Sequence, residues 1–176
     1  EAVVEGGECR VGLESTIVDL TGSVPRLLRP GGITLEQLKS VLGEVDIDPA
    51  VERALKDGEK PKAPGMKYRH YAPKAPVTIL MGSADKAAEY VRCHCAGKTA
   101  VICFDEECDV FDADVCVGYG SRNEPETLAH NLFAALRRMD DENVDVIFAR
   151  CPEGYGVEMA VKNRLSKAAG YNIVTL

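Results

Sequence analysis

The sequence predicts an α/β protein whose last hundred or so residues form a Rossmann-like, three-layer domain with a mainly parallel five-stranded sheet. From Pro76 onward, short apolar runs alternate with stretches of helical periodicity. The apolar runs are continuous and rich in β-branched residues, as in strands buried on both faces. The composition, 45% hydrophobic and 28% charged, is ordinary for a globular chain and argues against disordered, collagenous and membrane proteins.

The elements of this domain follow in order. We expect strands over residues 76–81, 98–104, 113–120, 144–152 and 171–176, and helices over 84–96, 124–142 and 156–170. Ser83 is the expected N-cap of the first helix, Pro125 lies in the first turn of the second, and Gly170 follows the last turn of the third. One face of the second helix is apolar and should be buried: Leu128, Leu132, Ala135, Leu136 and Met139.

The first part of the chain has a different pattern. Residues 9–22 and 25–33 are expected to form two strands joined by the turn 21–25, and a capped helix begins at Thr34. Two strands and a helix bury too little surface to be stable alone, so this segment should be the end of a larger domain. The chain opens on "EAVVEGGECRVG" without a methionine, and we expect it to be a truncated or processed piece of a longer protein. The predicted division is 1–59, a linker over 60–76, and 77–176.

Several classes of function are disfavoured. The longest apolar runs are far shorter than the roughly 20 residues of a membrane-spanning helix, and no leader pattern opens the chain, so we expect a cytoplasmic protein. The seven cysteines are expected to be reduced. Residues 1–76 carry 11 basic and 12 acidic side chains, and residues 77–176 carry 10 and 16. This acidic C-terminal part would repel phosphates, which argues against direct tRNA binding.

Cys93, His94 and Cys95 are all possible metal ligands. If this segment is helical, adjacent side chains point about 100° apart and cannot converge on one ion. No second CxxC-type pair completes a tetrahedral set, so the sequence predicts no metal site.

Ligands of parallel sheets bind beyond the carboxyl ends of the strands, which directs attention to residues 118–123 and 151–156. Neither segment matches the dinucleotide motif G-x-G-x-x-G. The stretch "EGYG" (153–156) could hold an anion at a helix N-terminus, although a tight turn that requires glycine is the favoured interpretation.

The segment "KPKAPGMKYRHYAPKAPV" (60–77) has five basic residues, no acidic residue and four of the nine prolines, in a chain of net charge -7. Proline keeps it extended and Gly65 allows one sharp bend, which suits a basic lid over a phosphate-bearing ligand. The alternative is a solvated interdomain linker whose charges only aid solubility.

Three motifs carry a family resemblance. "GLESTIVDL" (12–20) with "LLRPGGI" (27–33) resembles the closing part of an α+β YrdC-like domain. "APGMKYRHYAP" (63–73) resembles the linker that follows this domain in the two-domain threonylcarbamoyl-AMP synthases. "NRLSKAAG" (163–170) is similar to the last helix of that family. The resemblance covers nearly the whole chain, as the end of a catalytic domain, a linker and a C-terminal accessory domain.

The resemblance implies a nucleotidyltransferase that makes threonylcarbamoyl-AMP and pyrophosphate from ATP, L-threonine and bicarbonate, with Mg²⁺ expected. Other proteins would then transfer the threonylcarbamoyl group to a tRNA adenosine beside the anticodon. Ser15 would face threonine and Arg29 would contact ATP. Lys67, Tyr68, Arg69, His70 and Tyr71 would fold over the cleft near the nucleotide. The resemblance implies no covalent catalytic residue in this chain.

The family's catalytic domain has a Lys-x-Arg and a Ser-x-Asn element upstream of the first of these motifs, and residues 1–11 of this sequence contain neither. We therefore expect the chain to be inactive without the rest of its catalytic domain. The alternative function is a non-catalytic, Rossmann-like module that binds a nucleotide or anion and regulates another protein. Because the first segment would expose sheet edges, we also expect it either to pair with a second copy or to leave residues 1–60 poorly ordered.

Overall fold

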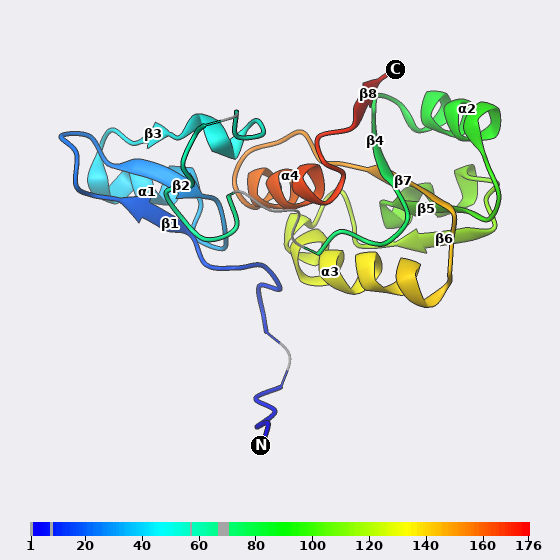
Figure 1. The fold of residues 1–176 in the computed structure, drawn as a ribbon, viewed down its shortest axis with the longest axis horizontal. Helices are drawn as coiled ribbons and strands as arrows, with labels where there is room; N and C mark the ends of the chain where they lie inside the picture. The colour runs from blue at the N-terminus through cyan, green and yellow to red at the C-terminus, as the bar shows by residue number, and fades with distance from the viewer. Residues whose placement is uncertain (1, 8, 57, 67–70) are drawn as a thin grey trace.

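The computed structural model describes residues 2–7, 9–56, 58–66 and 71–176. Two sheets lie at opposite ends of the molecule, and helix α4 lies between them (Figure 1). Residues 2–7 extend away from both (Figure 1).

The larger sheet confirms the predicted fold class. Its five strands are β4 (Val77–Met81), β5 (Thr99–Cys103), β6 (Val115–Gly118), β7 (Val146–Arg150) and β8 (Ile173–Thr175). They pair in the order β6-β5-β7-β4-β8, and every pair is parallel. Each strand lies inside its predicted range.

Helices cover both faces of this sheet. Helices α3 (Pro125–Asp141) and α4 (Val157–Ala168) pack on one face, and α2 (Ala84–His94) with the 3₁₀ helix η2 (Asp105–Val110) packs on the other. The connection η2 was not predicted, since six residues without apolar periodicity give no helical signal. Ser83 caps α2, Pro125 begins α3, and Gly170 has the positive φ of a residue after a helix end.

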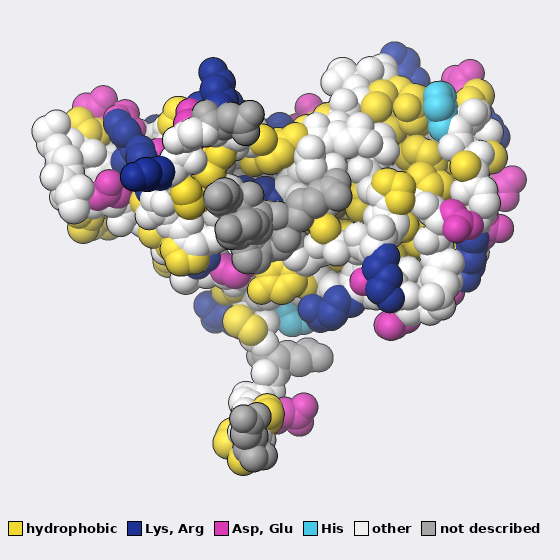
Figure 2. All heavy atoms as spheres, viewed as in Figure 1, with side chains coloured by type: hydrophobic (Ala, Val, Ile, Leu, Met, Phe, Trp, Pro, Cys, Tyr) yellow, Lys and Arg dark blue, Asp and Glu magenta, His cyan; other side chains and the backbone are white. Residues whose placement is uncertain are grey.

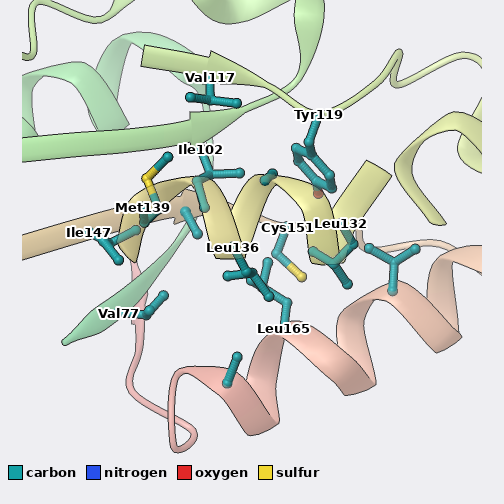
Figure 3. Packing of buried hydrophobic residues seen from close by; sticks show 14 of the residues in the cluster. Val77, Ile102, Val117, Tyr119, Leu132, Leu136, Met139, Ile147, Cys151 and Leu165 are labelled. Atoms are coloured by element: carbon teal, nitrogen blue, oxygen red, sulfur yellow. The ribbon is translucent and has the colours of Figure 1, made fainter. Parts of the chain in front are cut away.

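The main core lies between the sheet and the helices α3 and α4. Figure 3 shows Leu132 and Leu136 of α3 and Leu165 of α4 directed toward the sheet residues Ile102 and Ile147. All five side chains are essentially inaccessible to solvent, and burial of each stabilises the fold by about 1.5 to 3 kcal/mol.

The smaller sheet contains three strands. β1 (Ile17–Asp19) is antiparallel to β2 (Arg26–Arg29), as the predicted turn requires, and β3 (Asp46–Ile47) is parallel to β2. β3 and the following 3₁₀ helix η1 (Pro49–Val51) were not predicted. Helix α1 (Leu35–Leu42) begins as expected, with a capping box between Thr34 and Gln37.

Among the described residues, no helix is both long and apolar enough to cross a bilayer. On the face drawn in Figure 2, basic and acidic side chains are mixed rather than gathered by sign.

Candidate functional site

The candidate site is the seam between the two sheets, which comprises residues 14–16, 29–32 and 63–66 together with Asn163, Arg164 and Lys167 of α4. The chain order brings these segments together. β2 ends at Arg29, the turn Pro30-Gly31-Gly32 follows, and α4 passes beside both.

Ser15 and Arg29, the two predicted substrate-binding residues, are in direct contact. Nη2 of Arg29 donates to Oγ of Ser15 at 3.0 Å, and Nε donates to the Ser15 backbone oxygen at 2.8 Å. The β1–β2 pairing explains the contact, because Ile17 is the register partner of Arg29. Nη1 also donates to the carbonyl oxygen of Pro64 at 3.4 Å, so the same guanidinium group contacts the linker.

Gly31 makes this close approach possible. A Cβ at this position would overlap the carbonyl oxygen of Glu14 and lie 2.6 Å from the backbone nitrogen of Thr16. Thr16 holds the other side of the turn, since its hydroxyl donates to the Ile33 oxygen at 2.7 Å and accepts from the Ile33 nitrogen at 3.1 Å. Only glycine lets the two backbones meet here.

Helix α4 contributes two buried cations to the seam. Arg164 is 3% exposed, and its Nε lies 2.8 Å from Oε2 of Glu14. This pair is an ion contact without hydrogen-bond alignment, and neither atom has another hydrogen-bond partner among the described residues. Lys167 is 5% exposed and donates to the Gly65 oxygen at 2.9 Å.

Burial perturbs both cations. Desolvation lowers the pKa of Arg164, against the opposing effect of the Glu14 carboxylate. Desolvation, together with the neighbouring positive charge of Arg164, lowers the pKa of Lys167 to about 8. The seam therefore holds more positive charge than its own carboxylate neutralises, which suits an anionic ligand.

Sequence reasoning missed Glu14, Arg164 and Lys167 as members of the site. Arg164 and Lys167 are three residues apart and share one helix face, which was a usable signal. Nothing in the sequence indicated that this face meets residue 14, because that contact depends on how α4 docks.

The predicted lid is described only in part. Lys67, Tyr68, Arg69 and His70 lie outside the described residues. Tyr71 has a φ of 60°, and its ring centroid lies 4.2 Å from that of Phe133 on α3. On the other side of the gap, Ala63 and Met66 are buried beside Leu28 and Ala50. Both described ends of the linker therefore pack against the body of the protein.

The segment 153–156 joins β7 to α4, as expected. Gly154 leaves room for the carboxylate of Glu158, which a Cβ at position 154 would overlap. The carboxylate of Glu36 also approaches this segment. A hydrogen bond from the Glu36 backbone and one from the Gly156 backbone lower the pKa of Glu36. These contacts favour the tight-turn interpretation over an anion site.

The cysteines are free. Cys93 and His94 end α2, and Nδ1 of His94 contacts the Tyr90 oxygen at 2.8 Å. Three other cysteines, Cys103, Cys108 and Cys116, have sulfur atoms within 4.8 Å of one another. This cluster cannot be recognised in the sequence, because its members belong to three different elements.

A family model and the curated relatives of this chain all carry the same description. The family model described as "Threonylcarbamoyl-AMP synthase, C-terminal domain" matches residues 33–170. The threonylcarbamoyl-AMP synthase of Pyrococcus abyssi is 44% identical over 99% of this chain and 51% of its own length. That of Bacillus subtilis is 40% identical over 98% of this chain and 49% of its own length. The chain thus spans about half the length of these relatives.

Two solved structures of P. abyssi Sua5 superpose on nearly the whole of this chain. The crystal structure of P. abyssi Sua5 complexed with L-threonine superposes with a TM-score of 0.85 at 44% identity, over 100% of this chain and 51% of the other. A P. abyssi Sua5 variant in which a histidine and the following tyrosine are replaced by alanine gives a TM-score of 0.82, over 97% of this chain and 49% of the other.

Proposed function

The chain belongs to the family of threonylcarbamoyl-AMP synthase C-terminal domains, and from this premise we propose that it is the C-terminal half of such a synthase. The full protein would convert ATP, L-threonine and bicarbonate into threonylcarbamoyl-AMP and pyrophosphate. It would act in the cytoplasm and supply the transferase proteins that modify tRNA. Residues 1–59 would complete the catalytic domain, 60–76 the linker and 77–176 the accessory domain.

The observation that carries the proposal is the contact of Arg29 with both Ser15 and the linker. Two motifs that a synthase would use, one for threonine and one for ATP, meet at one guanidinium group. Ser15 is exposed, so its hydroxyl is accessible to a ligand. The threonine complex of the P. abyssi relative supports threonine as a ligand of the full protein.

The seam suits the reaction chemistry. A carbamate oxygen attacks the α-phosphorus of ATP, the bond between the α-phosphorus and the bridging oxygen breaks, and pyrophosphate leaves. Charge develops on phosphoryl oxygens, so positioning and cationic stabilisation matter more than a protein nucleophile. Arg29 offers a planar fork for phosphate or ribose oxygens, and Lys167 and Arg164 add positive potential beneath it.

Mg²⁺ is expected with ATP, but the described seam does not form its site. Glu14 is the carboxylate at the seam, and it is paired with Arg164. A magnesium ion prefers several oxygen ligands, so it would be held by the triphosphate or by residues outside this chain.

Pyrophosphate release tests the proposal. The full-length protein should release pyrophosphate from ATP only when threonine and bicarbonate are both present, and the 176-residue chain should release none. Release by the full-length protein at the same rate without threonine would rule the proposal out.

A second candidate function is supported by one observation. A cavity of about 370 Å³ lies between helix α4 and the strands β4 and β8, and its lining includes Gly82, Glu153, Lys162 and Ser166. The accessory half could bind a small anion there. Titration of the whole chain with ATP or phosphate, compared with Lys162→Met, distinguishes this function, because a cavity site would lose affinity in the variant and a seam site would not.

A further inference from the structure

We propose that Cys103, Cys108 and Cys116 form a binding site for one thiophilic d¹⁰ cation of the Zn²⁺ or Cd²⁺ type. The site is separate from the seam and independent of the proposed synthase function. It lies on the α2 face of the larger sheet, where no part of the proposed reaction takes place.

Strand register brings the three sulfur atoms together. In the parallel β5–β6 pair, Val101 is opposite Cys116 and Cys103 is opposite Gly118, so both cysteines are on the same face, one diagonal step apart. The 3₁₀ helix η2 then returns the chain over this face and places Cys108 above them.

The distances match those of a metal–thiolate site. Sγ of Cys103 lies 3.7 Å from that of Cys108 and 3.6 Å from that of Cys116. With metal–sulfur bonds of about 2.3 Å, a tetrahedral ion holds its thiolates about 3.8 Å apart. The cluster needs only small adjustments to bind an ion, because all three sulfur atoms are already within 4.8 Å of one another.

The surroundings suit a cation held on one side by sulfur. Cys103 is fully buried, whereas Cys108 and Cys116 are half-buried, so the ion would be reached from the solvent side and could keep a water as its fourth ligand. A Cβ at Gly118 would overlap the carboxylate of Asp105 and lie 3.0 Å from Sγ of Cys108, so glycine at this position lets a carboxylate lie close to the sulfur atoms.

Nearby charge also favours a cation. The segment "DEECDV" (105–110) that carries Cys108 contains four acidic residues and no basic one; of these, Glu107 is paired with Arg122 and Arg150. Asp105 and Asp109 lie close enough to act electrostatically on Cys108 and Cys116, respectively. Soft thiolate ligands select zinc-type ions over Mg²⁺ or Ca²⁺.

The test uses the whole chain, fully reduced, with Cd²⁺ as the probe, because cadmium thiolates absorb in the ultraviolet by charge transfer. The background variant Cys9→Ser/Cys93→Ser/Cys95→Ser removes the exposed thiols and serves as the control. It should bind one Cd²⁺ per chain, with the thiolate absorption band, and Zn²⁺ should displace the cadmium.

Adding Cys108→Ser or Cys116→Ser to this background should weaken Cd²⁺ binding by well over tenfold, since even loss of an outer-shell partner costs about 10- to 100-fold. Both positions are half-buried, and circular dichroism would verify that each variant folds. Absence of a one-equivalent thiolate band in the background variant, or an undiminished band in folded Cys108→Ser and Cys116→Ser, would overturn the proposal.

Discussion

Glu14 and Arg164 are 150 positions apart in the sequence, and their side chains lie 2.8 Å apart across the seam. The arginine side chain is 2% exposed and the glutamate 22%. Glu14 lies just before β1 of the smaller sheet, and Arg164 belongs to helix α4, which packs on the larger sheet. The pair therefore links the smaller sheet to the larger one.

Replacing Glu14 by glutamine should destabilise the chain by about 3 kcal/mol, because Arg164 would stay buried without its countercharge. The double variant Glu14→Gln/Arg164→Met should lose less than the sum of the single variants. Urea unfolding measures both effects. Asp46→Asn, which breaks the exposed Arg26–Asp46 pair, is the control and should cost no more than about 1 kcal/mol. Strictly additive single effects would show that the pair is not coupled.

Lys167 should make stability depend on pH. Its pKa in the folded protein is about 8, below the ordinary value of 10.5. Between these values the unfolded chain binds a proton that the folded chain has released, so stability rises with pH through this window. Below pH 8 both states are protonated, and the full cost of burying the charge is present.

The variant Lys167→Met lacks this titration. The free energy of unfolding of the wild type should therefore increase relative to Lys167→Met as pH rises from below 8 toward 10.5. The exposed Lys162→Met is the matched control on the same helix and should show no such change. A difference between wild type and Lys167→Met that is constant with pH would contradict the perturbed amine.

Gly31→Ala should destabilise the seam. The added methyl group overlaps the Glu14 carbonyl oxygen and lies close to the Thr16 nitrogen. Both are backbone atoms that cannot rotate away. Overpacking of this kind costs about 1 to 3 kcal/mol. Gly22→Ala, whose Cβ would meet only the Val24 oxygen at an ordinary 3.5 Å, is the control. Equal thermal stability of the two variants would mean that the backbone can adjust at position 31.

The sequence was sufficient where local pattern determines structure. The strands of the larger sheet are continuous apolar runs, and Thr34, Ser83, Pro125 and Gly170 mark helix ends through their own backbone chemistry. Each of these signals is contained within one element, so it can be seen without knowledge of the fold.

Long-range relationships were not predictable in the same way. β3 is two residues long and forms only because β2 offers it an edge. Glu14 meets Arg164, and Cys116 meets Cys103, through helix docking and strand register. The contact of Ser15 with Arg29 was partly predictable. Each residue was a separate candidate in the sequence, and the predicted hairpin then places them together.

The assignment of the seam as the nucleotide site is tested by comparing Arg29→Ala with Arg26→Ala in the full-length protein. The readout is threonine- and bicarbonate-dependent pyrophosphate release. Both arginines lie on β2, but Arg26 is paired with the exposed Asp46, whereas Arg29 contacts Ser15 and the Pro64 carbonyl oxygen. We predict that Arg29→Ala lowers kcat/KM for ATP by about 100-fold, as expected when a charged donor at a phosphoryl site is removed. Arg26→Ala should leave it nearly unchanged. Unchanged kcat/KM for ATP in folded Arg29→Ala would contradict the assignment of the seam as the nucleotide site.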